Sequence, residues 1–463
     1  MAPRSAHAPA QPAPCYLAIA FERPLKLDKS VSALFMAALI WALLSLGFQA
    51  GSFDVINAFG ETFNFTSEGE SAMNGFENTL LHHLGSTAEI LLFLIGAMTI
   101  VEIIDLHCGF DLIKKAVKTK NKRKLLWIVG ILGFFLSAVI DNLTATIVLV
   151  TLVGKMFHDR NDRFWYASLI VLAANSGGAW SPIGDVTTTM LWIGKKVSAP
   201  LLVEYLIVPS IISFAIPFLI ASYLPVFKGE ISEPEEKEED RKELLTSKLM
   251  LFLGIGMIVS VPIFKAITGL PPYLGMMFAL AVVWLVSEYS KPEKPFKEEK
   301  KLIYTVRQAL VRIDMASILF FFGILMAVAG LEALVYGSIN GEEVGTLRYA
   351  AEMLELTIPN QDIVVLLLGV LSAIVDNVPL VAATMGMYDF ATDHEIWHFI
   401  AYSAGTGGSM LIIGSAAGVA AMGMERIDFI WYLKKIGWLA FIGFITGAGV
   451  FLLIEKVLFP NVV

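Results

Sequence analysis

The sequence has little charge and almost no cysteine. Only 16% of its 463 residues are Asp, Glu, Lys or Arg, whereas 56% are hydrophobic and the mean hydropathy is +0.69. Because soluble domains average about 25% charged residues, this composition excludes a water-soluble fold. The two cysteines, Cys15 and Cys108, lie far apart and lack metal-ligand spacing, so we expect neither a disulfide framework nor a cysteine metal site.

Motifs that mark other classes of protein are also missing. The chain has no G-x-x-x-x-G-K-[ST] loop, which argues against an ATP-driven pump, and no H-E-x-x-H or G-x-S-x-G motif, which argues against an enzyme. It has no filter sequence of the kind repeated in tetrameric channels. The net charge of -8 is spread over loops, so nucleic acid is not an expected partner, and no cofactor is expected.

The sequence does contain a series of apolar runs between Val31 and Gly449. A helix needs about 20 residues to cross a bilayer, and runs of this length recur along the chain between charged loops. We therefore predict an all-α polytopic membrane protein. Because cytoplasmic loops are enriched in Lys and Arg, the stretch 51–85, which has neither, is expected to be an outer loop, and the basic stretch 114–124 an inner one.

By this placement of basic loops, two long apolar stretches each begin and end on the same side of the membrane. Residues 125–157 leave the basic stretch 114–124 and reach a second basic group before residue 164. Residues 363–388 leave the outer side and return to it. We predict that both are re-entrant hairpins, which are tolerated in a membrane only where they are buried in protein or line a cavity.

Both hairpins contain the same motif. Ser137-Ala-Val-Ile-Asp141-Asn142-Leu-Thr144 and Ser372-Ala-Ile-Val-Asp376-Asn377-Val-Pro379 are offset by 235 residues (376 minus 141). Each is followed by a Gly-Gly pair and a further Gly, in the stretches 164–194 and 396–424, where these glycines and Pro182 are expected to break a helix. Because the hairpins enter from opposite sides, we predict an inverted-topology repeat, which places a transport site near the bilayer midplane.

The repeat sets the expected organisation of the chain. The charged run of Glu, Lys, Asp and Arg near the middle is the most obvious linker. The predicted parts are an N-terminal segment 1–30 with a truncated first helix, a first repeat half 31–227, a charged cytoplasmic linker 228–248 and a second repeat half 249–463.

Oxygen-bearing side chains at the hairpin tips indicate the chemistry. An Asp within a bilayer costs at least ~2.5–3.5 kcal/mol on insertion scales, and neither motif contains a Lys or Arg partner. Hard cations prefer oxygen ligands, and a buried carboxylate can hold a proton instead. We predict that the hairpin-tip Asp residues bind a cation or a proton competitively, with Na⁺ on Asp141, Asn142, Asp376 and Asn377, and with further ligands among Ser137, Ser372, Thr144, Asn175, Asp185, Thr187, Thr188, Thr406, Ser409 and Ser415.

Each of these features also has a purely structural explanation. The Asp141-Asn142 pair is typical of a cap at a hairpin tip, a role that is compatible with ion binding. A single Gly-Gly pair is typical of close helix packing in membranes, but two pairs in register beside Asp-Asn motifs favour a site. Asp185 is either a ligand or a cap after the break at Pro182, and we favour the ligand.

These motifs, together with Asn175-Ser-Gly-Gly-Ala-Trp-Ser-Pro-Ile-Gly-Asp185-Val-Thr187-Thr188, resemble those of the NhaD-type sodium/proton antiporters of the ion transporter superfamily. The resemblance runs from about Tyr16 to the C-terminus. It implies a fold related to the divalent-anion symporters, usually as a homodimer, and exchange of Na⁺ or Li⁺ for H⁺ in the bacterial inner membrane. Carried over by motif, the expected functional residues are Ser137, Asp141, Asn142, Asn175, Asp185, Thr187, Thr188, Ser372, Asp376 and Asn377.

One departure from the family concerns the start of the chain. The family has a full first helix before the position of Tyr16, whereas this chain has the polar, Pro-rich segment Met1–Pro14 there. That segment is rich in Ala and contains Arg4 but no acid, which is compatible with a transit remnant. A plastid envelope is therefore the alternative to the bacterial inner membrane.

The alternative function is an anion transporter of the same superfamily. Such a protein would carry a dicarboxylate, arsenite or silicate, and it would need hydroxyls, amides and helix dipoles at the hairpin tips without fixed negative charge. Asp141 and Asp376 argue against it.

Overall fold

The computed structural model describes residues 29–112, 119–231, 246–290, 306–339 and 342–458. In these ranges, eight helices are long and apolar enough to cross a membrane, and one further pair of consecutive helices passes the same test together although it is bent at its junction. The prediction of an all-helical polytopic membrane protein is confirmed at this level. The expectations for the first helix, in 1–30, and for most of the linker 228–248 lie outside the described residues.

The spans are the longest apolar helices of the described residues. The single spans are α3 (Lys29–Gln49), α5 (Glu70–Leu106), α7 (Lys122–Ile140), α11 (Ala199–Ser222), α12 (Ser247–Thr268), α13 (Pro272–Tyr289), α16 (Met315–Ala333) and the run of α22 (Phe429–Tyr432), η4 (Leu433–Gly437) and α23 (Trp438–Leu458); the bent pair is α17 (Thr346–Thr357) with α18 (Gln361–Leu371).

Shorter helices lie between the spans. They are α4 (Phe65–Glu68), α8 (Asn142–Met156), α9 (Arg160–Gly178), α10 (Val186–Ile193), η1 (Pro225–Phe227), α15 (Val306–Arg312), α19 (Asn377–Met387), α20 (Glu395–Gly407), η3 (Gly408–Met410) and α21 (Ala416–Glu425).

The chain forms two compact units, and each takes residues from both predicted repeat halves. The first unit comprises residues 1–88, 314–357 and 382–388, and the second comprises residues 89–313, 358–381 and 389–463. Helix α5 contributes its first part to one unit and its second part to the other.

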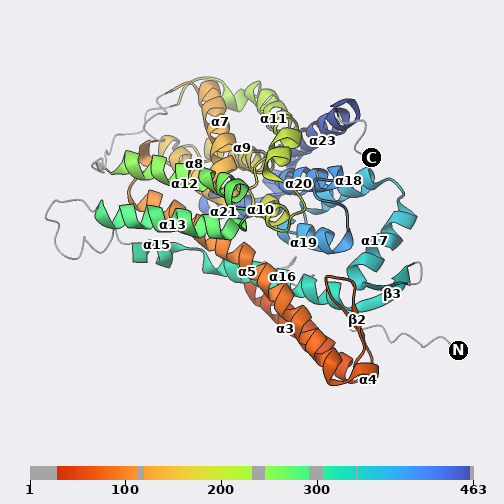
Figure 1. Cartoon of the computed structure of the whole chain (residues 1–463). Helices are drawn as coiled ribbons and strands as arrows, with labels where there is room; N and C mark the ends of the chain where they lie inside the picture. Colours follow the sequence, from red (N-terminus) through yellow and green to blue (C-terminus); the bar gives the residue numbers. More distant parts are fainter. Residues whose placement is uncertain (1–28, 113–118, 232–245, 291–305, 340–341, 459–463) are drawn as a thin grey trace. The chain divides into compact units, whose positions relative to one another are not determined.

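In the first unit, α3 packs along α16 (Figure 1). The two helices approach closely because Gly323 has no side chain: a Cβ there would lie 2.6 Å from the carbonyl carbon of Ala33. Two short antiparallel strand pairs, which the sequence did not predict, complete this unit. They are β1 (Val55–Ile56) with β2 (Thr62–Phe63), and β3 (Val335–Ile339) with β4 (Glu342–Gly345).

The stretch 51–85 is not simply the loop that we expected. Residues 70–85 form the start of α5, because Ala72 and Phe76 are buried with Phe48 and Val55 in the core of the first unit. Polar residues alternate with these apolar ones, so a search for a continuous apolar run misses this part of the helix.

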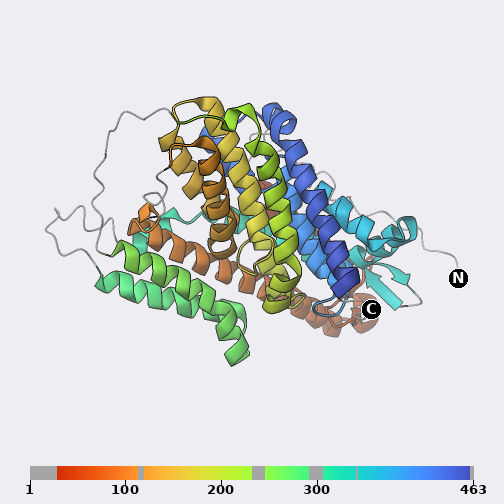
Figure 2. The ribbon, with the colours of Figure 1, turned by 90° about the horizontal axis from the view of Figure 1, so that it is seen from above.

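In the second unit, α7 lies beside α9, α18 beside α20, and α11 beside α23 (Figure 2). Every residue of α9 from Trp165 to Gly178 is buried, and so is every residue of α20 from Ile396 to Gly407. These two helices are therefore the centre of the unit, and the site described below lies where they end.

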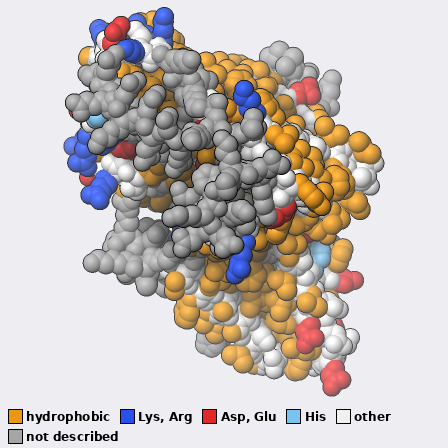
Figure 3. Space-filling model, turned by 90° about the vertical axis from the view of Figure 1, so that its left-hand side faces the viewer, with side chains coloured by type: hydrophobic (Ala, Val, Ile, Leu, Met, Phe, Trp, Pro, Cys, Tyr) orange, Lys and Arg blue, Asp and Glu red, His pale blue; other side chains and the backbone are white. Residues whose placement is uncertain are grey.

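The exterior is apolar, as lipid contact requires. Large hydrophobic side chains are exposed along α12 and α13, and hydrophobic side chains cover much of the described surface in Figure 3. The exposed residues on these two helices include Phe252, Ile263, Ile267, Phe278 and Leu285.

Candidate functional site

Asp141 separates α7 from α8 and holds a strained backbone conformation. Its φ of 74° and ψ of 157° lie in a region that is nearly restricted to glycine and costs about 1–3 kcal/mol for other residues. The half-buried carboxylate caps α8, accepting hydrogen bonds from the Thr144 backbone N–H at 2.7 Å and from the Thr144 hydroxyl at 3.0 Å. The predicted cap is therefore present, and it brings Asp141 and Thr144 together as expected.

Asp376 occupies the corresponding place before α19. It is half-buried, and the next residue, Asn377, is buried and begins the helix. Here the chain makes turns between Ser372 and Asp376, so the break between α18 and α19 is longer than the single residue at Asp141. The two tips thus share residue types and position but differ in backbone geometry.

The Asp185 carboxylate joins both tips. One of its oxygens, Oδ1, accepts a hydrogen bond from the Asn142 amide at 3.2 Å, and the other, Oδ2, accepts one from the Asn377 amide at 3.1 Å. Oδ2 also accepts a hydrogen bond from the Thr187 hydroxyl at 2.8 Å. With only 3% of its surface exposed, Asp185 is a buried anion that is stabilised by donors from both hairpin motifs.

Asn175, at the end of α9, extends this network. Its amide oxygen accepts a hydrogen bond from Asn142 at 3.1 Å, and its amide nitrogen donates to the hydroxyls of Ser409 and Ser415 at 2.9 Å each. The amide nitrogen of Asn142 thus donates twice, to Asn175 and to Asp185, which leaves its amide oxygen as the atom able to bind a cation.

The carboxylates of the site influence one another. Asp141 and Asp376 are both near enough to Asp185 to act on it electrostatically. Three acidic side chains with no Lys or Arg in their motifs make this region attractive to a cation. In the part of the chain that the structure describes, no group of three or more His, Cys, Asp or Glu lies together so that it could hold a metal ion, so a cation here would also need the amide and hydroxyl oxygens of the site.

Two serines of the motifs hold the segments before Asp141 and Asp376 to the central helices α9 and α20. The Ser137 hydroxyl donates to the Ala174 carbonyl oxygen at 2.6 Å, and the Ser372 hydroxyl donates to the Ala404 carbonyl oxygen at 3.0 Å. Both hydroxyls are therefore bonded to backbone oxygens of α9 and α20. The structure therefore places Ser137 and Ser372 beside the tips, as positioning residues, with their hydrogen atoms directed away from the carboxylates.

The paired glycines permit equivalent turns in the two central segments. A Cβ on Gly178 would lie 2.5 Å from the Gly184 carbonyl oxygen, and a Cβ on Gly408 would lie 2.5 Å from the Gly414 carbonyl oxygen. Gly178 and Gly408, the second glycine of each pair, thus let the chain fold back on itself. The folded segment ends at Asp185 or Ser415, the residue just before α10 or α21. These glycines therefore allow close packing, as their structural explanation requires, and they also position the residues of the site.

The hydroxyls of two predicted threonine ligands donate to backbone oxygens. The Thr188 hydroxyl donates to the Asp185 carbonyl oxygen at 2.9 Å, and the Thr406 hydroxyl donates to the Tyr402 carbonyl oxygen at 2.6 Å. Asp185 itself makes no side-chain cap to α10, so its carboxylate is directed into the network instead. Tyr432, which no sequence signal indicated, donates to the Ser409 carbonyl oxygen at 2.8 Å and fixes that residue.

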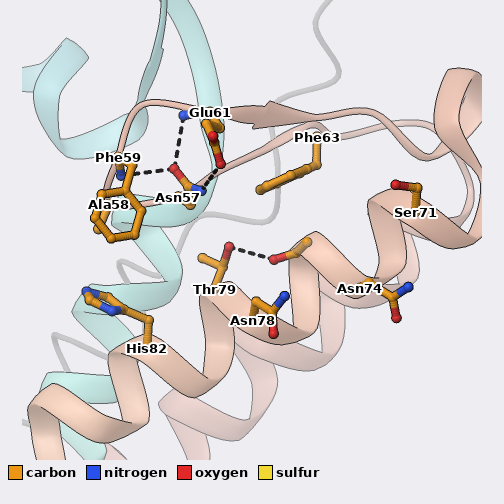
Figure 4. A pocket seen from close by; sticks show the side chains of 11 residues that line it. Asn57, Ala58, Phe59, Glu61, Phe63, Ser71, Asn74, Asn78, Thr79 and His82 are labelled. Carbon is orange, nitrogen blue, oxygen red and sulfur yellow. Dashed lines mark hydrogen bonds between the residues drawn. The ribbon is translucent and has the colours of Figure 1, made fainter.

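A separate hollow of about 450 Å³ lies in the first unit (Figure 4). It is bordered by the turn between β1 and β2 and by one face of α5. The Glu61 carboxylate accepts a hydrogen bond from the Asn57 amide at 2.8 Å, and His82 lies opposite, beside Phe59. None of the predicted site residues lines this hollow, so it has no part in the site.

Comparison with known proteins identifies the family. The family described as "Citrate transporter" matches residues 16–398. Sodium/proton antiporter 1 of Arabidopsis thaliana is 42% identical over 447 residues, which are 96% of this chain and 71% of that protein. Sodium/proton antiporter 2 of the same plant is 38% identical over 446 residues, 95% of this chain and 97% of that protein.

A bacterial relative and a solved structure extend the comparison. The Na(+)/H(+) antiporter NhaD of Vibrio parahaemolyticus is 32% identical over 429 residues, 87% of this chain and 94% of that protein. The crystal structure of the Alcanivorax borkumensis YdaH transporter, described as having an unusual topology, covers 94% of this chain and 99% of its own with a TM-score of 0.59. At 12% identity, this last likeness concerns the fold alone.

The family resemblance carried by the Asp-Asn motifs is thus confirmed over nearly the whole chain, and the family is one of transporters and not of enzymes. The chain belongs to the citrate transporter family and, within it, to the NhaD-type sodium/proton antiporters.

Proposed function

We propose that this protein is a secondary active transporter that exchanges Na⁺ or Li⁺ for H⁺ by alternating access. The observation that carries the proposal is the Asp185 carboxylate, which accepts hydrogen bonds from Asn142 and Asn377 at the two hairpin tips. The cation would bind among Asp141, Asp376 and Asp185, with amide oxygens of the tips as further ligands. The names of the relatives, which are sodium/proton antiporters, support the same pair of ions.

The predicted inverted repeat is part of this proposal. Its support is a set of equivalent contacts at the offset of about 235 residues: Ser137 with Ala174 against Ser372 with Ala404, and Gly178 with Gly184 against Gly408 with Gly414. In this reading α7–α8 and α18–α19 are the re-entrant hairpins, and α9–α10 and α20–α21 are the broken helices. Helix ends that meet at such breaks direct backbone dipoles at an ion.

Competition between the two ions follows from the carboxylates themselves. A lone pair of a carboxylate oxygen binds either a proton or a cation, so a site built from Asp141, Asp185 and Asp376 must release one to take the other. Protonation would also turn one Asp185 oxygen into an O–H donor and leave the other as an uncharged acceptor, which would weaken the hydrogen bonds from both tips. Exchange of ions and movement of the hairpins would then be coupled through one residue.

The alternative is a sodium-coupled anion transporter for a dicarboxylate or arsenite. The description "Citrate transporter" of the matching family favours it. The cluster of three acidic side chains without a neighbouring Lys or Arg in the motifs disfavours it, because a substrate anion there would be repelled.

The remaining expectations follow the resemblance. A homodimer is part of the proposal, as is a location in a bacterial inner membrane or a plastid envelope. Relatives come from a plant as well as from bacteria, so both locations agree with the comparisons.

Ion exchange by the purified protein in proteoliposomes tests the proposed function. We expect NaCl and LiCl to move protons across the membrane, and sodium succinate to act no better than NaCl, because only the cation binds at the acidic site. The internal pH is followed with a fluorescent dye, and KCl and choline chloride serve as controls. A response that requires succinate or another anion would assign the chain to the anion transporters.

Removing either tip charge should abolish exchange. We expect Asp141→Asn and Asp376→Asn to lower the rate of Na⁺-driven proton movement by about 100-fold or more, since Asn keeps the shape but neither titrates nor neutralises a bound cation. Asp428→Asn is the matched control, because Asp428 caps α22 through the Trp431 N–H but is exposed. Normal exchange in either tip variant, measured in the same proteoliposomes, would refute the role of that Asp.

The two tips should act on Asp185 together. Asn142→Ala and Asn377→Ala each leave one Asp185 oxygen without its amide donor, and we expect each to raise the half-saturating Na⁺ concentration by about 10-fold. In the double variant, the change in the free energy of Na⁺ binding should differ from the sum of the two single changes by at least about 0.5 kcal/mol, because both amides bind one carboxylate. Ser176→Ala changes a buried residue outside the network and is the control: its effect should add to that of Asn142→Ala. If the effects of the two Asn variants were also additive, Asp185 would not couple the tips.

A further inference from the structure

His398 is a buried histidine that the transport site does not use. It lies near the start of α20, has no exposed surface, and stacks on Tyr205 of α11 with ring centroids 4.6 Å apart and planes 9° apart. Within the described part of the chain, neither ring nitrogen has a hydrogen-bond partner. Its Nε2 is 3.5 Å from the Asp393 carboxylate, which is within ion-pair distance but too long for a good hydrogen bond.

Asp393 connects the segment after α10 to the segment before α20. Its carboxylate accepts a hydrogen bond from the Ser198 N–H at 2.6 Å, and its own N–H donates to the Lys196 carbonyl oxygen at 2.8 Å. Next to it, the Thr392 hydroxyl donates to the Lys195 carbonyl oxygen at 2.7 Å. Asp393 also holds a left-handed φ of 63°, so this connection keeps the backbone in a strained form.

The other repeat half has a permanently charged counterpart of His398. Arg163 precedes His398 by 235 residues, the offset of the hairpin motifs, and a phenylalanine follows each of them. The Arg163 Nε lies 3.0 Å from the Glu425 carboxylate at the end of α21. Arg163, near the start of a central helix, thus pairs with an acid from the other half of the chain, whereas the acid beside His398 precedes it by five residues.

We propose that His398 and Asp393 form a proton-binding site that tightens the connection between the segments after α10 and before α20. The Nε2 of His398 lies 3.5 Å from the Asp393 carboxylate; on protonation the ring would become a charged donor and be drawn closer to that carboxylate. The Arg163–Glu425 pair serves as a reference contact that is charged at every pH, because an Arg side chain is always charged.

The surrounding charges are compatible with a proton on His398. Burial alone would raise the pKa of Asp393, but the nearby His398 side chain and the hydrogen bond from the Ser198 N–H outweigh it and lower that pKa, so Asp393 is an anion at neutral pH. Acidic side chains gather around the stacked Tyr205, and lysines lie on the neighbouring segments. The acids are Glu204 of α11, Glu395 of α20 and Glu455 of α23, and the lysines are Lys195, Lys196 and Lys265.

The proposed proton site has a clear direction with pH. Histidine side chains change charge between about pH 5 and 8, so the added attraction is present at the acid end and lost at the alkaline end. In the proposed antiporter, this would restrain the two segments in acid and release them in alkali. Only that consequence rests on the proposed function; proton binding by the pair does not.

Hydrogen–deuterium exchange of the purified protein, without Na⁺, tests the proposal directly. The Ser198 and Asp393 amides are the donors of the connection, so peptides containing them report on it. After correction for intrinsic exchange rates, we expect protection about five-fold or more greater at about pH 5.5 than at about pH 8.5. Peptides containing Arg426 and Ile427, beside the Arg163–Glu425 pair, should show equal protection at both pH values.

Variants separate a proton site from a structural histidine. His398→Gln should remove the pH difference, and His398→Arg, which copies Arg163, should give the protected state at both pH values. His394→Gln, a change of the neighbouring histidine that caps α20, should keep the difference. Equal protection of the wild-type segments at both pH values, or a difference that survives in His398→Gln, would overturn the proposal, whether or not the protein transports Na⁺.

Discussion

The arrangement of the site depends on one buried carboxylate that accepts hydrogen bonds from two amides distant in sequence. Asn142 and Asn377 begin α8 and α19, and both donate to Asp185. A buried anion without such donors would cost several kcal/mol, so the tips cannot separate from Asp185 without replacing these bonds. Satisfying this one group therefore ties the starts of α8 and α19 to the segment before α10.

In the proposed exchange, the same requirement would make the site responsive to ions. A fully satisfied polar network in a membrane is stable and rigid, whereas the acidic side chains of this one would change their hydrogen bonds on gaining a proton or binding an ion. Asp141, held in a strained conformation, and the nearby Asp376 supply further negative charge. Strain of this kind is kept only where the surrounding structure enforces it, and it is concentrated at functional sites.

Much of this site could be predicted from sequence because the membrane makes polar residues informative. Asn142, Asn175, Asp185, Asn377 and Ser409 were named from the two repeated motifs and the segments after them, and the structure brings them into one hydrogen-bond network. Asp141 lies beside this network and caps α8 through Thr144. The sequence could not predict that one carboxylate serves both tips, because that depends on how distant segments pack. It did not predict that the hydroxyls of Thr188 and Thr406 donate to backbone oxygens, and it gave no signal for the first turns of α5 or for the short strands.

The most direct test of the account is a count of protons released when Na⁺ binds to the purified protein in weakly buffered solution. If Na⁺ and H⁺ compete for the Asp141, Asp185 and Asp376 carboxylates, NaCl should release protons, choline chloride should not, and the number released should fall as the pH rises and the carboxylates lose their protons beforehand. Saturable Na⁺ binding without any proton release, at every pH tested, would contradict a shared site for the two ions.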